Sequence, residues 1–92
     1  MDKVVLKLYV TGQTLRTRRA IANLYRICEE ELSDNYEIVI IDVLEYPNLA
    51  ESEKILVTPT LIRQLPPPLR RTIGDLSNRD RVLMGLELGK LD

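Results

Sequence analysis

The chain has 92 residues, of which 45% are hydrophobic and 29% charged, and it contains a single cysteine and no histidine. This length and composition are typical of one folded domain, residues 1–92. Without histidine the usual general base and most zinc sites are missing, and one cysteine cannot form an internal disulfide. The 13 basic and 14 acidic residues nearly balance, and Phe and Trp are absent, which argues against nucleic-acid binding. We therefore expect no cofactor, no metal and no nucleic-acid partner.

Residues 1–46 predict a strand, a helix and a second strand. The β-branched run VVLKLYV at residues 4–10 reads as a buried strand. It is too short and too charged for a signal peptide or a membrane span, so we expect a cytoplasmic protein. From Ala20 to Leu32 the apolar residues recur at three- and four-residue steps, which predicts a helix starting near Arg16 and ending near residues 33–35. Residues 37–43 (EIVIIDV) complete a right-handed βαβ unit with parallel strands.

Prolines mark the expected boundaries of the elements in residues 47–92. Pro47 is suited to open a short helix that runs to Lys54 or Leu56. The Thr58–Pro59 step disfavours helix, and so predicts an extended entry into a strand at residues 60–62. The three prolines at 66–68 cannot donate backbone hydrogen bonds and predict a turn or stiff connector. Residues 69–75 are then expected to pair antiparallel with the preceding strand.

The last segment carries two competing patterns. Residues 82, 84, 86 and 88 are apolar and alternate at period two, as in a strand. Residues 76, 79, 83 and 86 fall instead at helical steps, and residues 77–80 (SNRD) resemble a capping box with Ser77 as the cap. Gly85 weakens both choices. We favour the helix because of the capping signal, while two nearly degenerate packings remain an alternative.

With a terminal helix the element order is βαβαββα, an α/β arrangement of the thioredoxin-like type. Thr58–Pro59 then stands where such folds place a cis proline, beside the loop after the first strand. A thiol oxidoreductase needs a low-pKa cysteine in that loop, but residues 11–14 read TGQT. Cys28 is predicted on the inward face of the first helix, as a buried core residue. Asp42 is interpreted as a cap at the end of a strand, and thiol chemistry is excluded.

Arginines cluster at residues 16–19, 70–71 and 79–81. One interpretation is a solvated surface balanced by the acidic residues 29–31 and 34. The other is a basic docking surface for an acidic protein partner, because guanidinium groups pair well with carboxylates.

Several segments resemble the KaiB family. They are LKLYV at residues 6–10, the Gly12 turn, IDVL at 41–44, residues 47–50, and the block KILVTPTL…LPPPLRRTIGDLSNRDRVLMGLEL within residues 54–88. The resemblance covers nearly the whole chain. It implies a non-catalytic clock or signalling adaptor that binds the N-terminal ATPase ring of a KaiC-type protein and regulates its phosphorylation or ATPase cycle.

The resemblance also implies a metamorphic protein. In this family residues 1–46 correspond to a constant βαβ half and residues 47–92 to a fold-switching half. A resting form, a dimer or tetramer, has the order βαββααβ, and a rarer thioredoxin-like form binds KaiC. Cyanobacterial members also capture KaiA, through the edge of the second strand at residues 38–43, and displace the thioredoxin-like sensory domain of a clock histidine kinase. Such a sensory domain is itself the alternative interpretation of this chain, with a thiol oxidoreductase as a more distant one.

Carried over by position, the resemblance assigns two sets of residues. The expected partner-binding residues are Pro47, Asn48, Lys54, Ile55, Leu56, Arg70 and Arg71. The expected fold-switch residues are Pro59, Gly85, Glu87 and Lys90. The sequence departs from the cyanobacterial pattern at Leu15, usually proline, at Lys90, usually aromatic, and in lacking an acidic C-terminal tail. These departures bear on KaiA binding and on the tetramer rather than on KaiC binding.

Overall fold

The computed structural model describes residues 3–88 and contains one four-stranded sheet with three helices. The expected order βαβαββα is confirmed. The elements in chain order are β1 (Val4–Val10), α1 (Leu15–Glu31), β2 (Tyr36–Asp42), α2 (Pro47–Ser52), β3 (Thr60–Leu65), β4 (Arg70–Ile73) and α3 (Arg79–Leu86).

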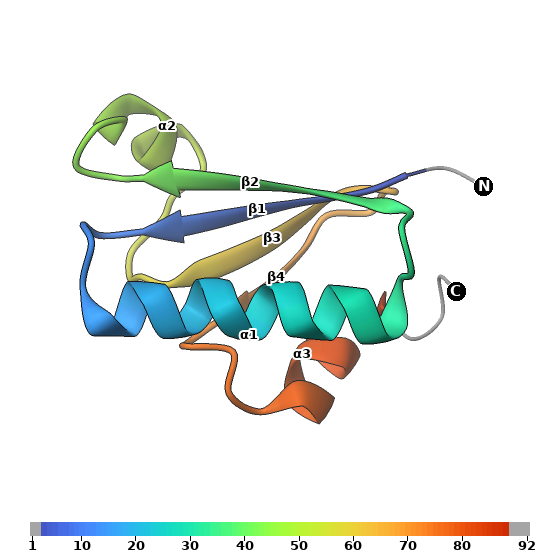
Figure 1. Ribbon diagram of the computed structural model, residues 1–92. Coiled ribbons are helices and arrows are strands. Elements are labelled where there is room, and N and C mark those ends of the chain that lie inside the picture. Colours follow the sequence, from blue (N-terminus) through green and yellow to red (C-terminus); the bar gives the residue numbers. More distant parts are fainter. Residues whose placement is uncertain (1–2, 89–92) are drawn as a thin grey trace.

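The sheet has the order β2-β1-β3-β4. β1 pairs parallel with β2, as a βαβ unit requires, and antiparallel with β3, while β3 and β4 form an antiparallel hairpin across residues 66–69. The proline turn predicted at 66–68 is therefore confirmed. α1 and α3 lie together on one face of the sheet, and α2 sits beyond the carboxyl end of β2 (Figure 1).

The two sheet faces carry separate apolar clusters because side chains alternate along each strand. Toward α1 and α3, the fully buried residues of the strands include Leu6, Leu8 and Leu61, which pack with Leu24 of α1 and Leu86 of α3. The opposite face carries a smaller cluster built on Tyr9, Ile41 and Ile62 with three half-buried neighbours. The main core is therefore the layer between the sheet and the two longer helices.

α1 begins where the sequence provides a cap. The Thr14 hydroxyl accepts a hydrogen bond from the Thr17 backbone N–H at 3.1 Å, which satisfies one of the free amides of the first turn. The helix ends at Glu31, slightly before the predicted residues 33–35. Cys28 is completely buried on the inward face of α1, as predicted, and burial raises the pKa of its thiol to about 12.

α2 ends earlier than the sequence suggests. We expected a helix through Lys54 or Leu56, but it ends at Ser52 with Glu53 as the C-cap. The reason is the backbone of Lys54, which adopts a left-handed conformation with φ of 55° and so turns the chain out of the helix. Residues 55–58 then lead back to the sheet without regular structure.

The last segment is a helix, but the cap differs from the prediction. Asn78, not Ser77, is the N-cap: its side chain accepts a hydrogen bond from the Arg81 N–H at 3.1 Å. Ser77 instead donates its backbone N–H to the Asp75 carboxylate at 3.0 Å. The predicted N-terminal cap is therefore present, but Asn78 provides it instead of Ser77, because Ser77 belongs to the preceding turn.

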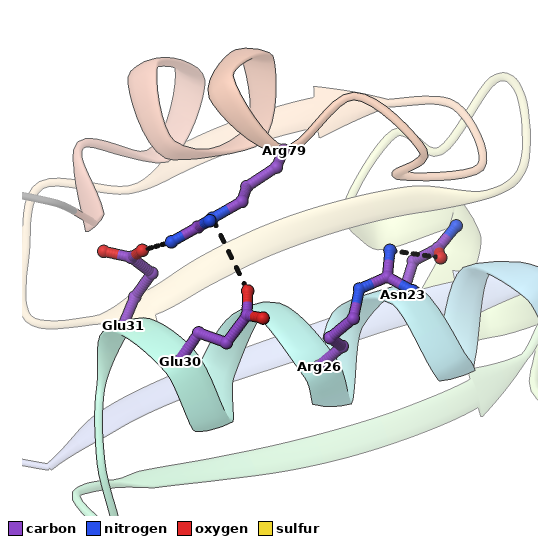
Figure 2. A network of polar contacts seen from close by, with 5 residues as sticks. All are labelled: Asn23, Arg26, Glu30, Glu31 and Arg79. Carbon is purple, nitrogen blue, oxygen red and sulfur yellow. Dashed lines mark hydrogen bonds and ion pairs between the residues drawn. The ribbon is translucent and has the colours of Figure 1, made fainter.

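α3 is tied to α1 by charged side chains. Arg79, at the start of α3, forms ion pairs with Glu30, at 3.6 Å, and with Glu31, both near the end of α1 (Figure 2). About two turns earlier in α1, the Asn23 amide donates to the Asp75 carbonyl at 3.0 Å and accepts from Arg26. These contacts join segments about fifty residues apart in the sequence, and they supplement the apolar packing of Val82 and Leu86.

Candidate partner-binding surface

The loop after β1 carries hydroxyl and amide groups rather than a thiol. The Thr11 and Thr58 hydroxyls lie 2.6 Å apart, so the loop contacts the segment that precedes β3. The Thr58–Pro59 peptide bond is cis, as the expected fold predicts. Asp42 accepts hydrogen bonds from the backbone N–H groups of Gly12 at 3.2 Å and Leu44 at 2.9 Å, which confirms its role as a strand-end cap.

Beside this loop, an open pocket of about 360 Å³ lies between α2 and the carboxyl ends of the strands. Six of its nine lining residues are apolar, and Thr11, Thr58 and Glu51 are the polar ones. The remaining lining residues are Val43, Pro47, Ala50, Ile55, Leu56 and Val57.

Around the pocket the chain exposes large apolar side chains. Leu56 is 91% exposed and Leu44 69% exposed. Tyr46, Leu49 and Val57 are each about half exposed. Contiguous exposed apolar side chains of this kind are typical of a protein-binding surface. We call the pocket lining together with Leu44, Tyr46 and Leu49 the α2 surface.

The structure gathers most of the expected partner-binding residues at this surface. Pro47, Ile55 and Leu56 line the pocket. Asn48 is exposed on α2, and Lys54 is exposed in the turn that follows it. The expectation came from family resemblance, and the geometry brings these five residues to one end of the molecule.

The paired arginines lie on opposite faces of the sheet. Arg71 shares a face with its register partner Ile62 and donates to the Glu53 carbonyl at 3.0 Å, so it borders the α2 surface. Arg70 lies on the face covered by α3 and forms an ion pair with Glu87 at 2.7 Å. Only Arg71 of the pair therefore contacts the α2 region.

The expected fold-switch residues are distributed over the second half. Pro59 is buried, and its carbonyl accepts the Gly74 N–H at 2.9 Å. Gly85 is exposed on α3, where an added Cβ would meet Thr72 at ordinary contact distances of 3.5 and 3.6 Å. Glu87 is the left-handed C-cap of α3. Lys90 lies outside the described residues.

Three of the remaining arginines interact with acidic groups of this chain. Arg79 is paired with acidic residues of α1, as the surface-balance interpretation predicts. Arg16 and Arg19 lie near Asp75, whose pKa is lowered first by hydrogen bonds from Ser77 and then by these two charges. The charges of these three arginines are therefore directed toward acidic groups of this chain. The three residues also lie far from α2 in the sequence.

Two features escaped the sequence analysis. The exposure of Leu44 and Leu49 is the first, because in the sequence alone these residues look like core leucines. Arg63 is 2% exposed within β3; one of its terminal nitrogens donates to the Pro68 carbonyl at 2.9 Å, and its Nε has no partner among the described residues. No signal in the sequence predicts that Arg63 is buried. Its burial depends on the pairing of β3 with β1, in which Arg63 lies opposite Leu6.

Within residues 3–88, no helix has the length and apolar character to cross a membrane. In the same part of the chain, no group of three or more His, Cys, Asp or Glu side chains is arranged to hold a metal ion.

The fold and the loop after β1 together define a thioredoxin-like domain without an active-loop cysteine. Solved structures agree on the fold: the N-terminal domain of Synechococcus elongatus SasA superposes with a TM-score of 0.81 at 20% identity, covering 99% of this chain and 86% of that one. Mitochondrial thioredoxin 3 of Saccharomyces cerevisiae superposes with a TM-score of 0.72 at 16% identity, covering 95% and 79%.

Sequence comparison identifies the family. The KaiB domain family matches residues 7–88. The circadian clock protein KaiB3 of Synechocystis is 61% identical over 88 residues, 96% of this chain and 86% of the relative. The circadian clock oscillator protein KaiB of Thermostichus vulcanus is 57% identical over 84 residues, 91% and 78% of the two chains. The chain belongs to the KaiB family, and its relatives are named as clock proteins rather than enzymes.

Proposed function

We propose that this protein is a non-catalytic, cytoplasmic clock or signalling adaptor that binds the N-terminal ATPase ring of a KaiC-type protein and regulates its phosphorylation or ATPase cycle. The observation that carries the proposal is the α2 surface, an open pocket bordered by exposed leucines in a chain of the KaiB family. A surface of this kind costs free energy in water and is stabilised when a partner covers it.

The chemistry of the α2 surface fits a protein partner. Its apolar centre provides burial, and its rim provides charges of both signs in Glu51, Lys54 and Arg71. Interfaces combine an apolar centre with a polar rim that excludes water and sets orientation. Lys54 and Arg71 supply two basic groups to the rim, each able to pair with a carboxylate on the partner.

We further propose that binding selects the thioredoxin-like form from an equilibrium with the resting βαββααβ form, a dimer or tetramer. The support is the double periodicity of residues 76–88 and the modest apolar anchoring of α3, in which Val82 and Leu86 are the buried residues. If the competent form is scarce, the apparent affinity falls by its fractional population. Pro59, Gly85, Glu87 and Lys90 would then control this equilibrium.

KaiA and a clock histidine kinase are proposed as additional partners where they exist. Among residues 3–88, β2 is an edge strand of the sheet and offers backbone groups for strand addition. A thioredoxin-like sensory domain of a histidine kinase would share the fold of this chain, which gives a physical basis for competition at one site. The identities of 55–61% to KaiB proteins favour the adaptor over the alternative that this chain is such a sensory domain.

The test is a titration of a KaiC-type N-terminal ring with the full chain, its Leu56→Gln variant and the Tyr25→Gln control on the exposed side of α1. We expect the wild-type chain and the control to bind alike. Leu56→Gln should bind about tenfold more weakly, because a central apolar contact is worth more than about 1 kcal/mol. Absence of wild-type binding would refute the KaiC assignment, whereas equal binding by all three would refute the α2 surface.

The switch is tested by backbone chemical shifts of residues 76–88, alone and with the ring. Strand shifts that become helical on binding would support the equilibrium, and Gly85→Ala should then increase the helical fraction because alanine is the better helix former. Helical shifts under both conditions would contradict a scarce competent form.

A further inference from the structure

We infer that Arg71 positions Ile55 and Leu56, which form one wall of the pocket beside α2. We further infer that β4 links this pocket wall to α3 through the adjacent Arg70. The inference rests on the proposed function of the α2 surface and names the residues that shape and regulate it. The observation behind it is a pair of consecutive arginines that contact opposite ends of the second half, one on each face of the sheet.

The first step is the contact of Arg71 with the end of α2. Its Nη2 donates to the Glu53 carbonyl at 3.0 Å. Glu53 is the C-cap of α2, and no basic residue stands in the last turn of the helix to satisfy its terminal carbonyls. The carbonyls of Leu49, Ala50 and Glu51 accept from backbone N–H groups of residues 53–55, and the Arg71 guanidinium supplies a donor to the next carbonyl, that of Glu53. The pKa of the Tyr9 phenol agrees with this position. Burial raises this pKa most, the charge of Glu53 raises it further, and the charge of Arg71 lowers it.

The second step runs from Glu53 to the pocket. Lys54 reverses the chain with a φ of 55°, and the Ile55 N–H returns to the Ala50 carbonyl at 2.9 Å. Ile55 and Leu56 then form part of the pocket lining. Because the turn is tight, fixing the Glu53 carbonyl also fixes where Ile55 and Leu56 stand. Arg71 thus acts on the pocket from outside it, as a positioning residue.

The third step is the other face of β4. Arg70 pairs with Arg63 in the sheet register and points toward α3, where its Nε contacts the Glu87 carboxylate at 2.7 Å. Glu87 closes α3 as its C-cap. Consecutive residues reach opposite faces only while the strand stays extended. Both contacts therefore require β4 in its present pairing with β3, so the loss of β4 would release α3 and the pocket wall together.

These contacts predict that the pocket wall depends on α3 more than α3 depends on the pocket wall. α3 supports β4 through Arg70 and also packs directly on it, since Gly85 faces Thr72 of β4. The pocket wall contacts β4 through the Arg71 side chain. Removing Arg71 should therefore disturb the wall and leave α3 in place, whereas weakening α3 should disturb both.

The experiment is NMR of the isolated full-length chain carrying Gly85→Ala, which favours the helical form of residues 79–86 without a partner. Arg71→Gln should shift the amide signals of residues 53–57 while residues 79–86 keep their helical shifts. Arg70→Gln should reduce the helical shifts at 79–86 and move the 53–57 signals as well. The charge-swapped chain with Arg70→Glu and Glu87→Arg should restore both regions. Arg18→Gln, a substitution of an exposed arginine on α1, is the matched control and should move neither region.

Binding to the ring then measures the consequence. Arg71→Gln is expected to weaken binding about 3- to 10-fold, the range of a charge-assisted hydrogen bond at a partly exposed site. Arg71→Lys keeps the charge and should lose less, and it serves as the test if Arg71→Gln fails to fold. Unchanged 53–57 signals in both Arg71 variants would overturn the positioning role. Arg70→Gln that alters 79–86 without altering 53–57 would overturn the link through β4.

These outcomes separate the inference from the proposed function. If the wild-type chain does not bind the ring, the function fails while the NMR result still decides whether Arg71 holds the pocket wall.

Discussion

The two halves of the molecule are held by different kinds of interaction. α1 spans 17 residues and buries Leu24, Ile27 and Cys28 among its inward positions, against strands that are themselves apolar. α3 spans 8 residues, buries Val82 and Leu86, and leaves Met84 79% exposed. Its attachment is completed by ion pairs with α1 and β4. Moderate concentrations of sodium chloride screen exposed ion pairs but do not screen apolar burial, so the second half should be the more sensitive to this salt.

The largest expected effect comes from matched leucine truncations in the two helices. Leu24 in α1 and Leu86 in α3 are both completely buried. Leu24→Ala should lower the free energy of unfolding by about 2–5 kcal/mol, because it leaves a cavity in the core shared by both halves. Leu86→Ala should instead release α3 while the amides of β1 and β2 stay protected.

Chemical denaturation and hydrogen exchange would measure this difference. Equal loss of protection across both halves in the two variants would mean that the halves unfold as one unit.

The next effect is a pH dependence located in the first half. Burial raises the pKa of Cys28 from 9.0 to about 12, so its folded thiol holds a proton that the unfolded chain releases. The associated stability is complete below pH 9 and is lost as the pH rises from about 9 toward 12. The loss should approach about 1.4 kcal/mol per pH unit within that window.

The measurement compares the wild-type chain with Cys28→Ala by urea denaturation at several pH values. The difference in unfolding free energy between them should shrink above pH 9, since the variant lacks the titrating group. Parallel pH curves for the two chains would contradict the assignment.

The smallest effect concerns the ion pairs of Arg79. Its side chain is 48% exposed, so its pairs with Glu30 and Glu31 should contribute only about 0.2–1 kcal/mol after solvent screening. Arg79→Gln should lower the ratio of helical to non-helical α3 by up to about 5-fold, and added salt should lower the same ratio in the wild-type chain. Helical chemical shifts at residues 79–86, measured by NMR, report the effect of the substitution and the effect of added salt. If salt acts on wild type and variant alike, the pairs carry no stability.

The sequence predicted the fold closely where periodicity and capping agree. β1, α1 and β2 follow from an uninterrupted apolar pattern, and the turn at residues 66–68 follows from the chemistry of proline. The end of α2 was missed because it depends on the left-handed backbone of Lys54, which no local signal marks. The choice of helix for residues 79–86 depended on a cap that the sequence placed one residue early, at Ser77 instead of Asn78.

The candidate site was less predictable than the fold. Its residues came from family resemblance, since an exposed leucine such as Leu56 looks in sequence like a core residue. The separation of Arg70 from Arg71 depends on strand pairing, which fixes the face to which each side chain points. Such relations arise from segments brought together by the fold, and a single sequence does not encode them locally.

β1 stands at the centre of the sheet with β2 on one side and β3 on the other. One flank is therefore covered by the first half of the chain and the other by the second half. Any rearrangement of residues 47–88 that removes β3 would uncover a full row of backbone donors and acceptors along VVLKLYV. An open edge with that apolar composition invites pairing with another chain. A second conformation of this protein must therefore supply a new strand beside β1, from its own sequence or from a neighbouring copy.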